Sequence, residues 1–402
     1  MSARVMARTT RDERRVAVLG AGILGSCTAL MLAGAGARVV LFEASATPMR
    51  GASRWNEGKI HLGYLYAGDP SLDTARKLLP GGVAFQPLIE NLLDAKLDPH
   101  MTAPSGELFL NHARSVVDAA QTERYLRAVW SLASELRPQD PEPRRLSTRE
   151  LASITTHPDI DAGFAVAERS IDTAWVADRL AARVMSEPAL ELLCDTHIES
   201  ISHGHDGWCV AAGGHQHGGF DAVVNALWEG RSAIDASAGL QVSPMSYRYR
   251  VAAFFNLAQP LPDLSNAVIT TGPFGDVKNY DGRRIYLSWY PHGLVLDHHG
   301  VHAPPPPVID EAADRRVLAG TLEAMADLIP RVADLARLAS DVTVGGGWVV
   351  AQGKGSLSDP ASTLHRRDKF GIVRDRGYYS VDTGKYSVAP WLAAQIAAEI
   401  AG

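Results

Sequence analysis

Short apolar runs and glycines alternate over the first part of the chain. Residues 16–19 are apolar, residues 20–25 carry three glycines, residues 23–32 are small and apolar, and residues 37–43 are again strand-like. Short apolar runs beside glycines predict buried strands, whereas the longer segment of helix-forming residues predicts a helix. The order strand, helix, strand predicts a βαβ unit, so we expect the chain to begin in a parallel sheet covered by helices.

The same pattern returns in the middle and at the end of the chain. Helical spacing over residues 173–185 is followed by strand-like runs over residues 190–201 and 220–226. Residues 377–401 predict a strand, a glycine turn and a helix opened by Pro390, at a position where the missing N–H of proline costs little. These segments extend the predicted α/β domain.

Two further segments predict strands of a different kind. Aromatic and aliphatic residues alternate with arginines over residues 246–257 and again over residues 284–290. This alternation is typical of antiparallel strands whose two faces meet different surroundings. Residues 311–338 predict an amphipathic helix that breaks at Pro330. We therefore expect a second, mixed domain.

Composition and charge narrow the class of protein. Of 402 residues, 46% are hydrophobic and 21% are charged, and no apolar run approaches the ~18 residues of a membrane span. The net charge of −6 gives no field that attracts nucleic acid, which favours a small-molecule partner. Cys27, Cys194 and Cys209 lack disulfide-framework or zinc spacing. We expect a cytoplasmic protein without a membrane span.

Two pairs of histidines and the N-terminal residues lie outside the segments described so far. His203 with His205, and His215 with His217, flank a predicted hairpin and could share a strand face as zinc ligands. The glycines around them favour an exposed hairpin, so we expect no metal site. Residues 1–14 are basic and polar and predict a flexible tail.

The glycine-rich turn carries the first chemical signal. Gly20, Gly22 and Gly25 form GxGxxG directly after a predicted strand and before a predicted helix, where backbone N–H groups and the helix dipole bind a pyrophosphate. Glu43 ends the next strand, where a carboxylate accepts hydrogen bonds from the adenosine ribose and repels a 2′-phosphate. The turn therefore predicts a dinucleotide, either FAD or NAD.

Four segments that follow this turn in the sequence resemble segments of a known family. Residues 51–64, GASRWNEGKIHLGY, resemble the second flavin-contacting segment of the D-amino-acid oxidase-like (DAO) family of FAD-dependent oxidoreductases. Residues 377–390, GYYSVDTGKYSVAP, resemble the strand, glycine turn and helix that close over the flavin in that family. Residues 196–198 resemble its adenine-contacting strand, and residues 223–228 its VVxATG turn, with Leu-Trp in place of the usual Thr-Gly.

The resemblance implies a fold and a division into domains. It implies an α/β protein with a discontinuous, Rossmann-like FAD-binding domain of the glutathione-reductase-2 type, and an inserted α+β substrate domain with a mixed or antiparallel sheet. The expected FAD-binding domain comprises residues 15–95, 150–235 and 343–402, and the expected substrate domain residues 96–149 and 236–342. The flavin ring would lie between the two domains.

The resemblance also implies the residues that contact FAD. No cysteine lies in the C-terminal segment and no histidine stands at Trp55 or Asn56, so we expect FAD to be bound non-covalently. The expected contacts are Gly20, Gly22, Ile23, Leu24, Gly25, Glu43, Ala44, Ser53, Arg54, Asn56, Gly58, Lys59, Ile198, Ala226, Leu227, Trp228, Thr383, Gly384, Lys385, Tyr386 and Ser387.

Catalytic candidates must hold the substrate, move a proton and place positive charge near the flavin. His61 falls where some sarcosine-oxidising members of the family carry a substrate-binding arginine. Arg248 and Arg250 alternate along the strand predicted over residues 246–257, so we expect them to share one face. An inward arginine beside a tyrosine would bind a carboxylate, although both arginines would equally suit a solvated face. The candidates are His61, Lys59, Lys385, Tyr386, Arg366, Arg250 and Tyr286, with the choice between Arg366 and Arg367 open.

The expected function is FAD-dependent oxidation. A small amine, amino acid or hydroxylated substrate would transfer hydride to FAD, which oxygen or another acceptor would reoxidise. One alternative is a FAD-dependent monooxygenase that uses NAD(P)H, because many share the glycine fingerprint. The other is a dinucleotide-binding protein without catalytic activity.

Overall fold

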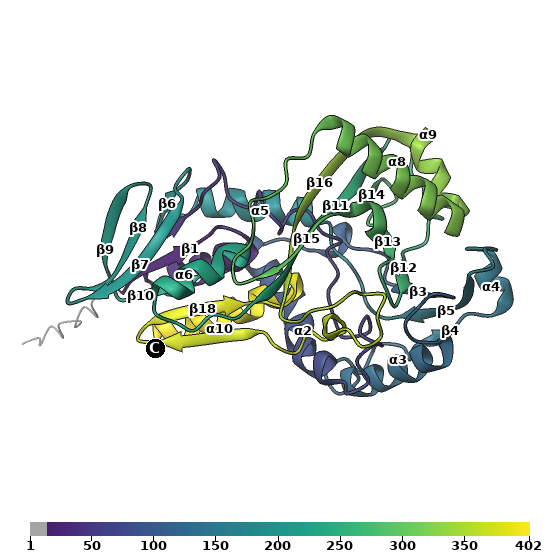
Figure 1. Ribbon diagram of the computed structural model, residues 1–402, viewed down its shortest axis with the longest axis horizontal. Helices are drawn as coiled ribbons and strands as arrows, with labels where there is room; N and C mark the ends of the chain where they lie inside the picture. The colour runs from purple at the N-terminus through teal and green to yellow at the C-terminus, as the bar shows by residue number, and fades with distance from the viewer. Residues whose placement is uncertain (1–13) are drawn as a thin grey trace, which may run out of the picture.

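The computed structural model describes residues 14–402 and contains two large sheets side by side (Figure 1). The flexible tail expected over residues 1–14 lies outside the described residues, apart from Arg14. Among the helices of residues 14–402, none is long and apolar enough to cross a lipid bilayer. The fold is α/β, as the sequence predicts.

The first sheet is mostly parallel and has the strand order β17-β18-β10-β1-β2-β6. Its members pair in parallel except for the antiparallel pair β17 and β18. The predicted βαβ unit is confirmed as β1, α1 and β2. The strands are β1 (Arg15–Leu19), β2 (Arg38–Phe42), β6 (Leu190–Leu193), β10 (Ala222–Asn225), β17 (Gly371–Asp375) and β18 (Tyr378–Asp382).

Alternation along β1 explains why both faces of this sheet are covered. Val16 and Val18 pack toward helices, whereas Ala17 and Leu19 pack toward a small three-stranded sheet. The helices are α1 (Ile23–Gly34), α2 (Asp73–Leu93), α5 (Thr173–Met185) and α10 (Ala389–Ala401), and the small sheet is β7 (Ile198–Gly204), β8 (Gly207–Ala212) and β9 (His215–Phe220). The strand-like run predicted over residues 190–201 is thus two strands in different sheets, β6 and β7.

The second sheet has nine strands and is mixed. Its order is β15-β11-β14-β13-β12-β3-β5-β4, and β16 pairs antiparallel with the other edge of the long strand β11. The strands are β3 (Glu107–His112), β4 (Arg144–Arg145), β5 (Ile160–Val166), β11 (Met245–Leu257), β12 (Ala267–Thr270), β13 (Gly275–Asn279), β14 (Arg284–Trp289), β15 (Leu294–Gly300) and β16 (Ala339–Ala351). The antiparallel strands predicted over residues 246–257 and 284–290 are confirmed.

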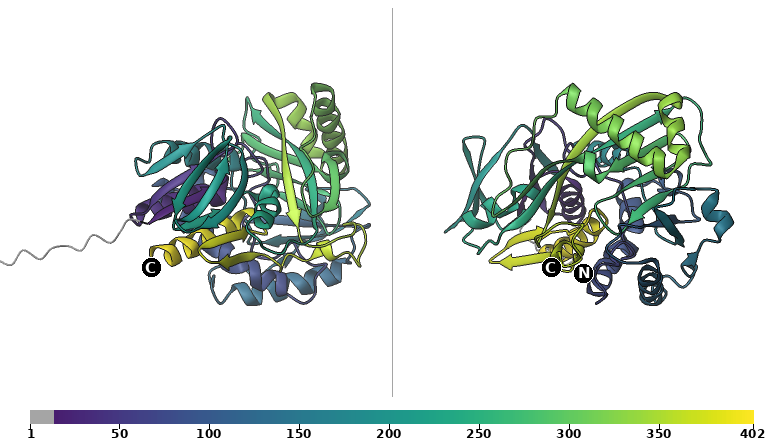
Figure 2. Two further views of the ribbon diagram at one scale, coloured as in Figure 1. Left: turned by 60° about the vertical axis from the view of Figure 1, so that its left-hand side comes forward. Right: turned by 45° about the vertical axis from the view of Figure 1, so that its right-hand side comes forward.

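Helices cover parts of both faces of this sheet (Figure 2), with α8 and α9 on one face and α3 on the opposite face beside β3 and β5. Ala253 and Phe255 of β11 pack against α8 and α9, whereas Arg248 and Arg250 point from the opposite face toward the interior. The predicted break at Pro330 separates α8 from α9. The remaining helices are α3 (Ala119–Ala133), α4 (Thr148–Ala152), α6 (Arg231–Ser237), α7 (Tyr290–Gly293), α8 (Glu311–Leu328) and α9 (Asp334–Leu338), with short 3₁₀ turns η1 (Asp98–His100), η2 (Trp228–Gly230), η3 (Pro330–Ala333), η4 (Thr363–His365) and η5 (Tyr386–Val388).

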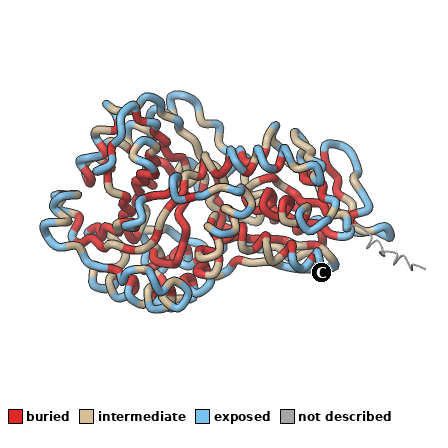
Figure 3. The backbone as a smooth tube through the Cα atoms, turned by 180° about the vertical axis from the view of Figure 1, so that it is seen from behind, coloured by how far each residue is buried: buried red, intermediate tan, exposed pale blue. Residues whose placement is uncertain are grey.

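The two sheets do not follow the expected domain boundaries at every point. Strand β5 falls in a range expected for the FAD-binding domain, yet it pairs with β3 and β4 in the nine-stranded sheet. Strand β16 begins before residue 343 and also belongs to that sheet. Strand pairing, which depends on distant partners, accounts for both differences. Buried residues are continuous through both halves of the molecule (Figure 3).

Candidate functional site

The glycine turn after β1 has the close backbone contacts that its sequence predicts. Gly20 has a φ of 91°, which favours glycine, and a Cβ at Gly25 would lie 1.8 Å from the carbonyl oxygen of Gly20. Glu43 accepts hydrogen bonds from the N–H groups of Ala21 at 2.9 Å and Ser45 at 2.8 Å. The carboxylate is therefore fixed beside the turn, and each of its oxygens keeps a lone pair for a further donor.

Three other predicted contacts meet this turn. The Ser53 hydroxyl accepts the N–H of Ile23 in the first turn of α1 at 3.0 Å, so the loop after β2 touches the helix N-terminus. A Cβ at Gly20 would lie 3.2 Å from the carbonyl oxygen of Ala226 and 3.3 Å from Leu227. The next residue, Trp228, donates its indole N–H to the carbonyl oxygen of Trp348 at 2.9 Å, which joins the turn to β16.

The remaining predicted contacts lie around these. Ile198 packs on the same face as Val40 and Phe42, and Ala44 directly follows Glu43. Arg54 is paired with Asp178 at 2.6 Å, so its guanidinium is engaged at the surface. Asn56 accepts the N–H of Gly58 at 2.9 Å and orders the loop that leads to His61.

The C-terminal closing segment reaches the same loop. Gly384 has a φ of 62° and donates its N–H to Asp382 at 2.9 Å. The Ser387 hydroxyl accepts the N–H of His61 at 3.1 Å, and Lys385 lies with its Nζ 5.7 Å from the ring centre of Tyr66. The segments that the sequence separates by more than three hundred residues are thus adjacent.

A cavity of about 150 Å³ opens where this closing segment meets the second sheet. Arg248 and Arg250 enter it from β11, Arg367 from the segment after η4, and Lys385 from the turn before η5. Its two acidic residues are Glu57 and Asp276. Other lining residues include Tyr66, Thr271, Tyr290, Val349 and His365.

Several donors at this cavity have no partner within the chain. Buried polar atoms without a hydrogen bond among the described residues are Nε and Nη2 of Arg248, Nε of Arg250 and Nη1 of Arg367, together with the hydroxyl groups of Tyr66 and Thr271. Tyr290 fixes both arginines of β11, because its hydroxyl accepts Nη1 of Arg248 at 3.0 Å and its ring lies 4.7 Å from the Arg250 guanidinium. The cavity is therefore lined by hydrogen-bond donors that have no acceptor among the described residues.

Charge and burial shift the pKa of the basic groups here. Removal from water, and then repulsion by Arg367, lower the pKa of Lys385 to about 7, although Glu57 opposes this shift. Burial and the neighbouring Arg248 lower the pKa of Arg367 to about 10. Burial, and then Lys385, hold the pKa of His61 well below its ordinary value, so its imidazole is neutral, with Nδ1 unpartnered. Burial is the larger cause of all three pKa shifts, and repulsion between neighbouring positive charges adds to it.

Lys59 lies in a different environment from the one expected. Its ammonium contacts the buried carboxylate of Glu107 and lies 3.7 Å from Glu168. Glu107 also holds Lys278 at 2.7 Å, and Lys278 lies 3.5 Å from Asp276 at the edge of the cavity. The ammonium of Lys59 is thus engaged in a buried ion cluster, which consists of Lys59, Glu107, Glu168, Lys278 and Asp276. The cluster was not predicted, because β3, β13 and two loops that lie far apart in the sequence contribute its members.

Three other catalytic candidates also lie in surroundings that differ from those expected from the sequence. Arg366 is exposed and pairs with Asp73 and Asp368, so the guanidinium that reaches the cavity is that of Arg367. Tyr286 is buried beside Phe254, with ring centres 5.1 Å apart, and does not line the cavity. Tyr386 packs against Phe85 at 5.6 Å, although its hydroxyl is buried and unpartnered. Arg248 was recognised only as sharing a face with Arg250.

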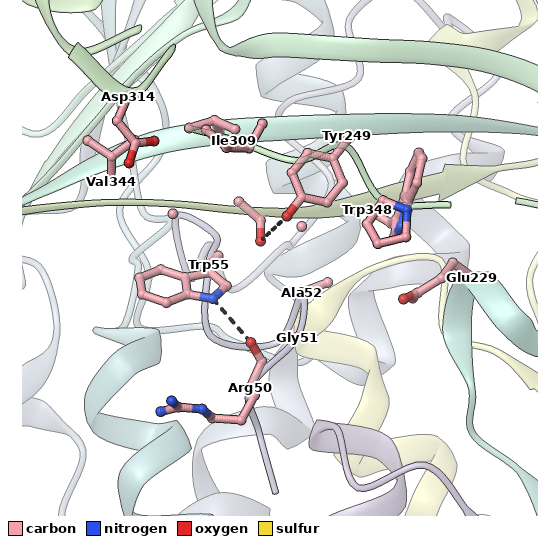
Figure 4. A pocket seen from close by; sticks show the side chains of 15 residues that line it. Arg50, Gly51, Ala52, Trp55, Glu229, Tyr249, Ile309, Asp314, Val344 and Trp348 are labelled. Atoms are coloured by element: carbon pink, nitrogen blue, oxygen red, sulfur yellow. Dashed lines mark hydrogen bonds between the residues drawn. The ribbon is translucent and has the colours of Figure 1, made fainter. Parts of the chain in front are cut away.

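A second cavity, of about 390 Å³, lies along the free edge of β16 (Figure 4). Trp55, Tyr249 and Trp348 form its aromatic walls, and the carboxyl groups of Glu229 and Asp314 enter from opposite ends. Burial raises the pKa of Glu229 to about 7. This cavity is thus aromatic, with two carboxyl groups and one guanidinium, that of Arg50. The smaller cavity, lined by Arg248, Arg250, Arg367 and Lys385, is the cationic cavity. No group of three or more histidine, cysteine or acidic residues with metal-binding geometry occurs in residues 14–402.

Comparisons with known proteins agree on one family. The sequence matches the model of the FAD dependent oxidoreductase family, DAO, over residues 15–357. The glycine oxidase from Geobacillus kaustophilus has a TM-score of 0.68 at 16% identity, covering 96% of this chain and 95% of that chain. The L-proline dehydrogenase from P. horikoshii has a TM-score of 0.65 at 15% identity, covering 96% and 93%.

A further similar structure is the L-alpha-glycerophosphate oxidase from Mycoplasma pneumoniae with FAD bound, which has a TM-score of 0.63 at 16% identity and covers 96% of this chain and 94% of that chain. At these identities the likeness establishes the fold. No curated protein sequence gives a significant match.

Proposed function

The chain belongs to the DAO family of FAD-dependent oxidoreductases, and from this premise we propose that it oxidises a small amino acid, amine or hydroxylated compound that carries a carboxylate. One observation supports the carboxylate in particular: the unpartnered Nε and Nη2 groups of Arg248 in the cationic cavity. Adjacent N–H groups on one guanidinium edge match the two oxygens of a carboxylate.

The dinucleotide turn supports FAD as the cofactor. Glu43 would accept hydrogen bonds from the ribose hydroxyls, because its oxygens are fixed beside the turn and keep free lone pairs. The N-terminus of α1 would hold the pyrophosphate, because N–H groups of a first helical turn lack acceptors within the helix. FAD would supply an acceptor for hydride and be bound without a covalent link.

The proposed reaction removes two electrons from the substrate. A carbon bearing hydrogen and an amine or hydroxyl loses hydride to FAD, the amine or hydroxyl loses a proton, and a C=N or C=O bond forms. Oxygen or another two-electron acceptor then takes the electrons from the flavin. Within the chain, Arg248 and Arg250 would orient the substrate, and Lys385 Nζ or His61 Nδ1 would accept the proton, because both bases are neutral or partly neutral near pH 7.

The two sheets support a division into two functional parts. We propose that the parallel sheet with its helices binds FAD and that the nine-stranded sheet, with β5 and β16 included, forms the substrate side. The cationic cavity lies between Arg248 of the second sheet and Lys385 of the closing segment, which follows β18 of the first sheet.

Anaerobic flavin reduction tests this proposal. We expect some 2-amino or 2-hydroxy acid in a panel of small substrates to bleach the flavin absorption bands without NAD(P)H. Rapid bleaching by NADPH or NADH alone would instead favour a monooxygenase. If no amine, amino acid or hydroxy acid reduces the bound flavin, the proposed oxidation is wrong.

A further inference from the structure

The cationic cavity holds more positive charge than a single carboxylate requires. Arg248, Arg250, Arg367 and Lys385 all line it, and among the described residues no carboxylate lies within 4.0 Å of any of their nitrogens. Arg248 and Arg367 are 2% and 9% exposed, so two of these charges are almost removed from water. Burial of unpaired charge is costly, and proteins offset it with a partner.

The acids of the cavity offset only part of this charge. Asp276 is already engaged, because it accepts a hydrogen bond from Ser288 at 2.6 Å and lies 3.5 Å from the ammonium of Lys278. Lys385 and Arg250 hold the pKa of Glu57 below its ordinary value, against the effect of burial, so Glu57 is a carboxylate. If Lys385, a proposed proton acceptor, is set aside, the guanidinium groups of Arg248, Arg250 and Arg367 still face this one free carboxylate.

We propose that the substrate carries two anionic groups, one bound by Arg248 and the other by Arg367. This inference rests on the proposed function, since it names the substrate class of the same site. The first group is the carboxylate beside the oxidised carbon, which takes the Nε and Nη2 edge of Arg248. The second is a carboxylate or phosphate at the other end of a short molecule, which takes Nη1 of Arg367.

The protein orients the guanidinium of Arg248 and anchors the backbone of Arg367. Tyr290 accepts one N–H of Arg248, so the remaining edge of that guanidinium faces the cavity. The backbone N–H of Arg367 donates to the Thr74 hydroxyl at 2.9 Å, which ties its segment to the start of α2. The unpartnered hydroxyls of Tyr66 and Thr271 line the same cavity and can donate to anion oxygens. The volume of about 150 Å³ limits the substrate to a short chain.

Binding of non-reacting anions to the FAD-loaded protein tests the proposal separately from turnover. The probes are succinate and glutarate against butyrate and valerate, and 3-phosphonopropionate, which carries a carboxylate and a phosphonate, against butyrate, all at constant ionic strength. Calorimetry and the flavin difference spectrum report affinity. We expect a dianion to bind at least about tenfold more tightly than the monoanion of the same length, because one further charge-assisted hydrogen bond forms.

The pattern of preference identifies the second group. Succinate or glutarate binding more tightly than 3-phosphonopropionate assigns a carboxylate as the second group, and 3-phosphonopropionate binding more tightly than succinate assigns a phosphate. Equal affinities for dianions and monoanions overturn the inference, even if a monocarboxylic acid reduces the flavin and the proposed function stands. Conversely, a dianion preference without any flavin reduction would support the anion sites and reject the proposed oxidation.

Variants locate the second site. Arg367→Met should abolish the preference for dianions while butyrate affinity changes little, and Arg367→Lys should retain part of the preference because the charge remains. Arg366→Met is the matched control, because that neighbouring guanidinium is exposed and paired with Asp73 and Asp368. A preference that survives in Arg367→Met and disappears in Arg366→Met would contradict the assignment. The wild-type panel alone decides whether a dianion is preferred.

Discussion

The buried ion cluster makes a quantitative prediction about Glu107. This carboxylate is 0% exposed, contacts Lys59, lies 2.7 Å from Lys278 and accepts the hydroxyl of Ser170 at 2.5 Å. Glu107→Gln keeps the size of the side chain but removes the charge that two buried ammonium groups share. Loss of one partner from a buried ion pair costs about 3–5 kcal/mol.

The two other acids of the cluster determine how large the loss of unfolding free energy is within this range of about 3–5 kcal/mol. Glu168 lies 3.7 Å from Lys59 and Asp276 lies 3.5 Å from Lys278, so each lysine keeps one more distant carboxylate. We therefore expect the free energy of unfolding to fall by about 3 kcal/mol, near the lower end. Urea denaturation followed by circular dichroism measures the change, provided that the slope of the transition is unchanged.

A surface variant and a pH series separate this explanation from others. Glu142→Gln removes an equal charge from an exposed pair with Arg127 at 2.9 Å, and should cost less than about 1 kcal/mol. In Glu107→Gln, buried lysines have a folded-state pKa below the unfolded one, so the unfolded chain binds more protons and stability rises with pH. The loss of unfolding free energy in Glu107→Gln relative to the wild type should therefore be smaller at pH 9 than at pH 6. A loss no larger than that of Glu142→Gln would refute the reasoning.

Three further predictions concern the cofactor and the cavity. Gly25→Ala should abolish FAD uptake, measured by absorption, because its Cβ would lie 1.8 Å from the carbonyl oxygen of Gly20; normal uptake would exclude that contact. The affinity for anions should fall as pH rises through about 7, because Lys385 then loses its proton. At pH 8 anion binding should return a proton to Lys385, and calorimetry in buffers of different ionisation enthalpy measures this proton uptake. Lys385→Met should remove that uptake, and an unchanged uptake would assign it to another group. The imidazole resonances of His61 should not shift between pH 6 and pH 8, since its pKa lies well below 6.5, and a titration in NMR spectra would contradict its burial among cations.

The sequence predicts the local parts of this fold better than the distant ones. The βαβ unit and the closing turn depend on glycines and apolar runs that lie close together in the chain, and β1, α1, β2 and β18 are found accordingly. Helix α2 was not predicted, because Pro80 and Pro87 lie inside it. The glycines after Pro80 are explained only by packing, since a Cβ at Gly82 would lie 2.2 Å from the carbonyl oxygen of His61.

The side-chain environments of the site depend on contacts that the sequence does not display. Arg366 and Arg367 are adjacent, and only the carboxylates around Arg366 and the Thr74 hydroxyl at the backbone of Arg367 decide which one is buried. Lys59 lies within the predicted flavin-contacting segment, but its partner Glu107 comes from β3, and the other lysine of the cluster from β13. Period-two alternation did indicate that Arg248 and Arg250 share a face of β11, because that pattern is local.

The visible absorption spectrum of the purified protein, taken before and after acid precipitation, tests most directly that this chain is a flavoenzyme. We expect flavin bands in the native protein that move entirely into the supernatant, where the released cofactor is identified as FAD. Yellow colour retained in the precipitate would show a covalent link and contradict the binding proposed here. A colourless protein that takes up no added FAD would contradict the account as a whole.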